Sequence, residues 1–67
     1  MISKAVEAAI AESVGQHTAV TVTATDADFL AVTIECDYCI WSEDDKTMDA
    51  WGKTDAGFTW RLHMVTA

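Results

Sequence analysis

FLAVTIECDYCIWS, residues Phe29–Ser42, is the longest stretch whose alternate residues sort into an apolar set and a polar or acidic set. Alternate side chains of an extended strand point to opposite faces of its sheet. Glu35 and Asp37 would therefore lie side by side on an exposed face. The core-facing set would be Leu30, Val32, Ile34, Cys36, Tyr38 and Ile40. The pattern predicts a central strand that carries two neighbouring carboxylates.

The segment before this stretch predicts a helix and then a strand. Ser3 can cap a helix whose apolar stripe recurs at helical spacing, and Gly15 is placed to end it in a left-handed conformation. That stripe consists of Ile2, Val6, Ala9, Ile10 and Val14. Threonines alternate with apolar residues over Thr18–Thr25, as in a half-buried strand. Asp26 and Asp28 are turn residues in this interpretation, which makes the two strands an antiparallel hairpin.

The segment after Trp41 is strongly acidic and fits two structures. In the first, Ser42 caps a short helix that ends at Gly52. In the second, residues 43–46 form a turn and residues 47–51 a short strand. We favour the helix. Phe58–Val65 then predicts an amphipathic strand, on which Arg61 would lie across from Glu35 or Asp37.

Together these elements predict one α+β domain over residues 1–67. An N-terminal helix would pack on a three-stranded antiparallel sheet, with a short acidic helix or loop between the second and third strands. About half of the residues are apolar, which favours a folded chain over a disordered one. The helix stripe should contact Val20, Val22, Val32, Ile34, Trp60 and Leu62.

Motifs for chemistry are scarce in this sequence. Cys36 and Cys39 form a C-x-x-C motif that, with His17 and His63, could supply zinc ligands. On one strand, however, residues three apart point to opposite faces. Neither a nucleophile elbow nor a phosphate-binding glycine loop is present. We therefore expect reduced thiols, no metal, no cofactor and no enzymatic activity.

Charge is the most informative property of the sequence. Eleven acidic residues and four basic ones give a net charge of -7. Such a protein repels nucleic acid and anionic membranes and attracts basic surfaces, although acidity also serves solubility or adaptation to high salt. Glu7 and Glu12 interrupt the N-terminal apolar residues, so no signal peptide is predicted and a cytoplasmic location is expected.

The predicted position of the carboxylates suggests mimicry of nucleic acid. Residues two apart on a strand are separated by about 6.6 to 6.8 Å, twice the strand rise. This is close to two phosphate steps of about 3.4 Å along one DNA strand. The predicted partner-binding residues are Asp26, Asp28, Glu35, Asp37, Glu43, Asp44, Asp45 and Asp49.

In size, charge and helix-plus-sheet layout, the whole chain resembles the small acidic anti-CRISPR proteins of phages and mobile elements, including inhibitors of type I-C systems. The resemblance includes no diagnostic motif, so it assigns no residue a role. It implies a DNA mimic in a bacterial host cell that blocks target binding by the Cascade effector, commonly at its large PAM-reading subunit. The alternative is an antitoxin-like or phage accessory module that binds its partner through exposed tryptophans.

Overall fold

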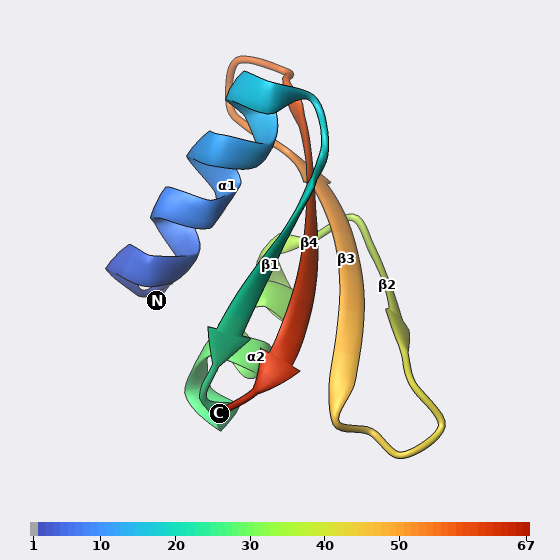
Figure 1. Ribbon diagram of the computed structural model, residues 1–67. Helices are drawn as coiled ribbons and strands as arrows, with labels where there is room; N and C mark the ends of the chain where they lie inside the picture. The colour runs from blue at the N-terminus through green and yellow to red at the C-terminus, as the bar shows by residue number, and fades with distance from the viewer. Residues whose placement is uncertain (1) are drawn as a thin grey trace.

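The computed structural model describes residues 2–67 and confirms an α+β fold (Figure 1). Two helices and four strands follow one another along the chain. In order they are α1 Lys4–Gln16, β1 Ala19–Ala24, α2 Asp26–Glu35, β2 Tyr38–Trp41, β3 Thr47–Lys53 and β4 Thr59–Thr66.

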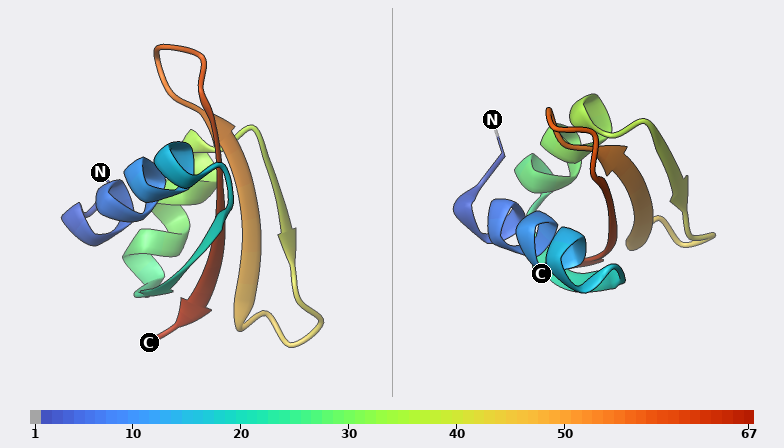
Figure 2. Two further views of the ribbon diagram at one scale, coloured as in Figure 1. Left: turned by 45° about the horizontal axis from the view of Figure 1, so that its top comes forward. Right: turned by 90° about the horizontal axis from the view of Figure 1, so that it is seen from above.

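The sheet is mixed and has the strand order β1-β4-β3-β2. β1 runs parallel to β4, whereas β2, β3 and β4 are antiparallel to their neighbours. The predicted three-stranded antiparallel sheet was therefore incomplete, because it lacked β3 and counted part of α2 as a strand. Both helices lie on the same face of the curved sheet, and the other face is open (Figure 2).

α1 begins as predicted and ends two residues later than predicted. The Val6 N–H donates to the Ser3 hydroxyl oxygen at 3.3 Å, which caps the first turn. Val6, Ala9 and Ser13 are buried against the sheet. Gly15 lies inside the helix, and the left-handed residue is His17, with φ of 54°.

The largest correction concerns residues 26–35, which form helix α2 instead of a turn and a strand. The Thr25 hydroxyl accepts a hydrogen bond from the Asp28 N–H at 3.3 Å, and the Asp28 carboxylate accepts one from the Thr25 N–H at 3.1 Å. This reciprocal pair is a capping box, which starts a helix directly after β1. Asp26 and Asp28 thus belong to the first helical turn, and the predicted hairpin does not form.

Residues 42–53 follow the alternative interpretation, because a turn and strand β3 replace the predicted acidic helix. The Ser42 hydroxyl donates to the Asp44 carboxylate at 2.6 Å, and the same carboxylate accepts from the Lys46 N–H at 3.1 Å. Asp45 adopts a left-handed conformation, with φ of 58°. These contacts reverse the chain, so that β3 returns antiparallel to β2.

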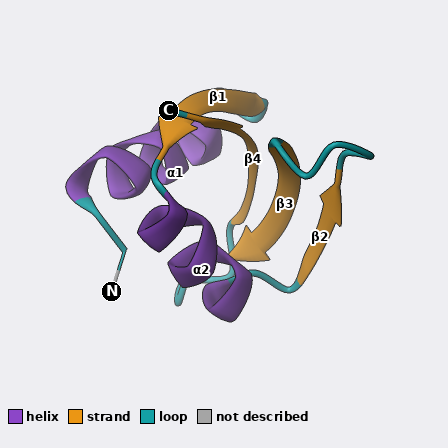
Figure 3. Cartoon of the chain, turned by 90° about the horizontal axis from the view of Figure 1, so that it is seen from below, coloured by secondary structure: helices purple, strands orange, loops and turns teal. Residues whose placement is uncertain are grey.

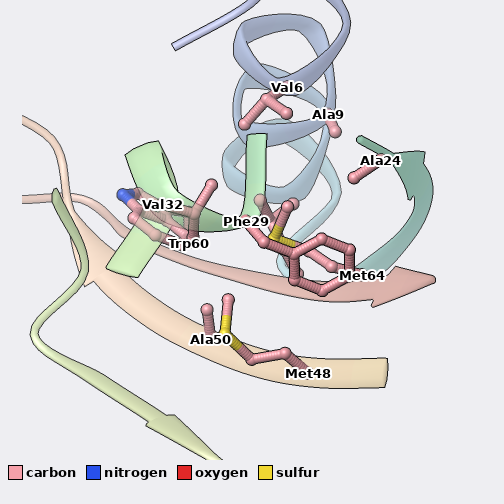
Figure 4. Close-up of a cluster of buried hydrophobic side chains, with 10 residues drawn as sticks. Val6, Ala9, Ala24, Phe29, Val32, Met48, Ala50, Trp60 and Met64 are labelled. Carbon is pink, nitrogen blue, oxygen red and sulfur yellow. The ribbon is translucent and has the colours of Figure 1, made fainter. Parts of the chain in front are cut away.

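The core lies between the two helices and the central strands (Figure 4). The prediction for the last strand is confirmed, since Trp60, Leu62 and Met64 of β4 are buried and the residues between them are not. Gly52 of β3 packs directly beneath the Trp60 indole, where a Cβ would overlap the ring. The full core set is Val6, Ala9, Ala24, Phe29, Val32, Met48, Ala50, Trp60, Leu62 and Met64.

Ser13 is a buried polar residue of α1. Its hydroxyl donates to the Thr18 carbonyl at 2.6 Å and accepts from the Arg61 N–H at 2.8 Å. One side chain of α1 therefore joins the start of β1 to β4, and both of its contacts are satisfied away from solvent.

Candidate partner-binding surface

Glu35 and Asp37 do not share an exposed sheet face, contrary to the prediction. Glu35 is the last residue of α2, and Asp37 lies in the connection that leads into β2. The spacing of about 6.6 to 6.8 Å assumed that both residues belong to one extended strand. Because Glu35 is helical, the comparison with phosphate spacing does not apply to this pair.

Asp49 lies apart from the other predicted acidic residues, on the open face of the sheet. Its carboxylate is 2.7 Å from Nδ1 of His63, its partner in the register of β3 and β4.

Arg61 was predicted to lie across from Glu35 or Asp37. It is instead paired with Trp51, and its guanidinium carbon lies 6.0 Å from the centre of the indole ring.

The structure places the net charge of the protein in one unit, formed by α2, β2 and their flanking turns. Residues 26–45 contain seven acidic residues and no Lys, Arg or His. The rest of the chain holds the other four acidic residues and all four basic ones, which cancel. The whole formal charge of -7 therefore belongs to this continuous segment.

Within that unit the carboxylates gather at two ends. α2 and β2 run in opposite directions, so the start of α2 lies at the same end of the molecule as the end of β2 (Figure 1). One end carries Glu35 and Asp37, and the other carries Asp26, Asp28, Glu43, Asp44 and Asp45. At 1.5 Å per residue, the ten residues of α2 separate the two ends by about 15 Å.

Between the acidic ends lie exposed apolar side chains, those of α2 and Trp41 on the helix side of the sheet and those of Tyr38 and Ile40 on its open face. Within residues 2–67, six large hydrophobic side chains are exposed, and Phe58 alone among them lies outside residues 26–45. The other five are Leu30 at 65%, Ile34 at 75%, Tyr38 at 60%, Ile40 at 48% and Trp41 at 41% of their full accessible area. We call these five residues, with the carboxylates at either end, the α2–β2 surface. An apolar area of this kind with a polar rim is typical of interaction sites.

A shallow groove runs through this surface where α2 faces the end of β2. It has a volume of about 300 Å³, and Leu30, Trp41, Asp26 and Asp45 are among the residues that line it. The Trp41 ring stacks on Phe29, with 5.3 Å between the ring centres, and is thereby held in place. Figure 3 shows α2 on the same side of the sheet as α1 and nearer to β2. The groove thus combines an apolar floor with carboxylates contributed by two segments.

Two of these carboxylates have lowered pKa values, for local reasons. The backbone N–H of Thr25 lowers the pKa of Asp28, and the Ser42 hydroxyl and then the Lys46 N–H lower the pKa of Asp44. Each hydrogen bond is made to the charged carboxylate and favours that form. Both groups therefore remain ionised at neutral pH, and both are already engaged in holding the backbone at the acidic ends.

The two cysteines contact the core instead of pointing to opposite faces of one strand. Cys36 is the C-cap residue that follows α2, Cys39 lies in β2, and both thiols are free and half-buried. Burial raises the pKa of the Cys36 thiol, and the neighbouring Cys39 raises it further. His17 follows α1 and His63 pairs with Asp49. Within residues 2–67, no three His, Cys, Asp or Glu side chains group closely enough to hold a metal ion.

Two features of the sequence indicate this surface. Thr25-Asp26-Ala27-Asp28 has the spacing of a capping box, with Asp in place of the usual Glu, and so marks the start of a helix. The formal charge summed over successive segments also shows that residues 26–45 carry all of the excess negative charge.

No protein-family model, curated protein or solved structure matches this chain. Of the two helices in the described part of the chain, neither is long and apolar enough to cross a membrane.

Proposed function

We propose that this chain is a non-enzymatic binding protein whose α2–β2 surface occupies a basic, nucleic-acid-binding surface of a partner complex and thereby inhibits it. One observation supports this most directly, namely that residues 26–45 hold the entire excess of negative charge together with five of the six large hydrophobic side chains that are exposed in the described part of the chain. Acidity that served only solubility would have no need to coincide with an apolar area.

The geometry also restricts the form of the partner. Two acidic ends about 15 Å apart, with apolar side chains between them, fit a surface that has two basic patches separated by apolar contacts. Four to five phosphate steps of one DNA strand span a similar length at about 3.4 Å each. Mimicry of DNA in this proposal depends on the placement of charge at the two ends, and the apolar centre adds contacts that DNA does not make.

The resemblance to small acidic anti-CRISPR proteins makes a type I-C Cascade the first partner to test. In this proposal the protein acts in the bacterial cytoplasm and prevents Cascade from engaging target DNA, with the large PAM-reading subunit as the expected docking site. Cascade must hold phosphates with Lys and Arg side chains, and these would attract the α2–β2 surface for the same reason.

Two matched double variants test which acidic residues matter. Glu35→Lys with Asp37→Lys changes one end of the α2–β2 surface, whereas Glu7→Lys with Glu12→Lys changes α1; each pair moves the formal net charge from -7 to -3. All four residues are exposed, so both variants should fold. In competition with target DNA for purified Cascade, the first pair should lose inhibition and the second should retain most of it. Deleting a docked carboxylate costs about 2 to 5 kcal/mol of binding free energy, whereas changing one outside the contact mainly affects the association rate. Because Glu7 and Glu35 line one groove, Glu12→Lys alone is the control for position.

Salt dependence gives a second, independent measurement. Affinity for the basic partner should fall steeply as ionic strength rises, since both surfaces shed counterions on contact. A flat response to salt, or loss of inhibition by the α1 pair alone, would contradict the proposal.

One observation favours a second candidate, an interaction module anchored by tryptophan. Trp41 is exposed by 41% and lines the groove, as an aromatic anchor would. In that case Trp41→Ala should abolish binding to a partner captured from the host, while the Glu35 and Asp37 reversals should have little effect. Trp51 is half-buried beside Arg61 on the open sheet face, so Trp51→Ala serves as the comparison.

A further inference from the structure

We infer that β2 accepts an added β-strand, namely an extended segment of the partner with basic residues at its two ends. The inference rests on the proposed function for the basic character of the partner. Its structural basis is separate and lies in the free edge of the sheet, where β2 has β3 on one side and no neighbouring strand from residues 2–67 on the other (Figure 2).

The free edge of β2 has backbone groups available for pairing. The Ser42 N–H donates to the Thr47 carbonyl at 3.0 Å, and Tyr38 and Ile40 hold equivalent positions in the same register. Because bonding direction alternates along an antiparallel strand, Cys39 and Trp41 direct their N–H and C=O groups away from β3. These two residues therefore present donors and acceptors to an incoming strand.

β2 is only four residues long, which by itself limits the addition of a strand, but it contains no Lys or Pro. Proteins commonly protect edge strands with Lys, Pro, a bulge or a covering loop. β2 reads Tyr-Cys-Ile-Trp, is regular over its four residues and has Tyr38 and Ile40 exposed. The opposite edge, β1, exposes Thr21 and Thr23 instead. The β2 edge is the apolar one, and Trp41 at its end shares the groove with Leu30 of α2.

Charge distinguishes a basic partner strand from a second copy of this chain. If two copies paired antiparallel about Ile40, Asp37 of each copy would face Glu43 of the other. Like charges directly opposite each other destabilise a sheet, and this arrangement would contain two such pairs. A segment with Lys or Arg at the two facing positions would replace both repulsions with attractions. In this register the ends of β2 therefore favour a basic strand and oppose self-association.

Strand addition also explains the placement of the exposed side chains. Tyr38 and Ile40 point to the open face of the sheet, and Trp41 points to the helix side, where it meets Phe29 and the groove. An added strand would contact Tyr38 and Ile40 with one set of side chains and Trp41, Leu30 and Ile34 with the other. Main-chain hydrogen bonds would provide affinity, and contacts with these side chains would provide specificity.

A synthetic peptide tests the inference without the natural partner. The probe is Lys-Val-Thr-Val-Thr-Val-Lys, which matches residues 37–43 in length and places a lysine opposite Asp37 and Glu43. Amide hydrogen exchange is followed by NMR on the whole protein, with and without the peptide. We expect the amides of Cys39 and Trp41 to exchange about tenfold more slowly in the complex, since each gains a hydrogen bond.

Three controls make the result specific. The same peptide with Glu at both ends should not protect these amides, because it restores the like charges. A version N-methylated at the residues that face β2 keeps its side chains and charge but cannot pair, and it should also fail. Cys39→Pro removes one outward N–H at a position where an edge strand tolerates proline, and it should abolish protection of Trp41. If that variant does not fold, the N-methylated peptide still decides the question.

Several outcomes would overturn the inference. They are no protection at millimolar peptide, equal protection by the N-methylated peptide, or protection at other amides only. Protection that appears without peptide as the protein concentration rises would assign the edge to a second copy. The proposed function is tested apart from this, because Glu35→Lys with Asp37→Lys can abolish DNA competition whether or not Cys39 and Trp41 become protected.

Discussion

The two helices cover the same face of the sheet but use their apolar residues differently. α1 buries Val6 and Ala9, and the side that it exposes carries Lys4, Glu7, Ala8, Ala11 and Glu12. α2 buries Phe29 and Val32, yet it also exposes Leu30 and Ile34. The fold accounts for every large apolar residue on the sheet side of α1. It gives no reason for the two on the outer side of α2, and these belong to the proposed contact with a partner.

The largest effect on stability should come from a charge placed beneath α1. Val6 is 1% exposed, so Val6→Asp would bury a carboxylate without a partner. An uncompensated buried charge costs about 3 to 5 kcal/mol, a large part of the total stability of a small domain. Chemical denaturation should show the loss, and hydrogen-exchange protection of β1 and β4 should collapse. Unchanged protection would mean that α1 does not pack as described.

Ser13→Ala should have the next largest effect, because it removes the link between α1, β1 and β4. The Thr18 carbonyl and the Arg61 N–H would each lose a partner. Leaving a buried polar group unsatisfied costs about 1 to 3 kcal/mol. Urea denaturation measures this change, with Thr33→Ala on α2 as a comparison, since the Thr33 hydroxyl bonds only to the Leu30 carbonyl at an exposed site. Equal losses from both variants would argue against a structural role for Ser13.

Thr25→Ala tests whether α2 depends on its cap. The substitution removes the hydroxyl that accepts the Asp28 N–H, and loss of such a cap costs about 0.5 to 2 kcal/mol. Ser3→Ala makes the equivalent change at α1. Thermal unfolding gives the total loss for each variant, and amide exchange shows where it falls. Increased exchange in α1 after Thr25→Ala would contradict a local effect.

A smaller effect should appear as a dependence of stability on pH. The pKa of Asp28 in the folded protein lies below its ordinary value of 3.8, so its contribution to stability is fully present above that value and is lost as pH falls through the lower, folded pKa. Asp28→Asn removes this contribution. The difference in unfolding free energy between the native protein and this variant should therefore shrink as acid is added below about pH 4. A constant difference would show that the Asp28 charge plays no part.

Leu30→Ser with Ile34→Ser should change stability least. Both side chains are mostly exposed, and surface substitutions of this kind usually stay within about 0.5 kcal/mol each. Binding to the partner should nevertheless weaken, because the apolar centre of the α2–β2 surface is lost. A variant that unfolds easily would show that these residues support the fold, and one that binds normally would remove them from the contact.

α1, β1 and β4 could be predicted from the sequence because each has one clear period. The stripe containing Val6 and Ile10 fits only a helix, and the alternation of Trp60, Leu62 and Met64 fits only a strand. The expectation that α1 packs on these strands is confirmed, since Val6 joins Trp60 and Leu62 in the core. The expected contact of α1 with Ile34 is wrong, because Ile34 is 75% exposed.

α2 was wrongly predicted because its exposed apolar residues imitate a strand. Leu30, Val32 and Ile34 alternate, and two of the three are β-branched, yet only Val32 is buried. The usual assumption that apolar residues face the core fails for Leu30 and Ile34, which are exposed. For the same reason the candidate site was predicted by residue type and charge but not by position, because Glu35 and Asp37 were placed on a strand that does not exist.

The parallel pairing of β1 with β4 has a consequence for how the chain folds. Ala19 pairs with Arg61, so the two strands join residues 42 positions apart in the sequence. The β2–β3 and β3–β4 hairpins close over much shorter loops and can form early, whereas α1 and β1 must wait for β4 before they have a surface to cover. During synthesis the N-terminal helix and strand would therefore remain unprotected until β4 has left the ribosome.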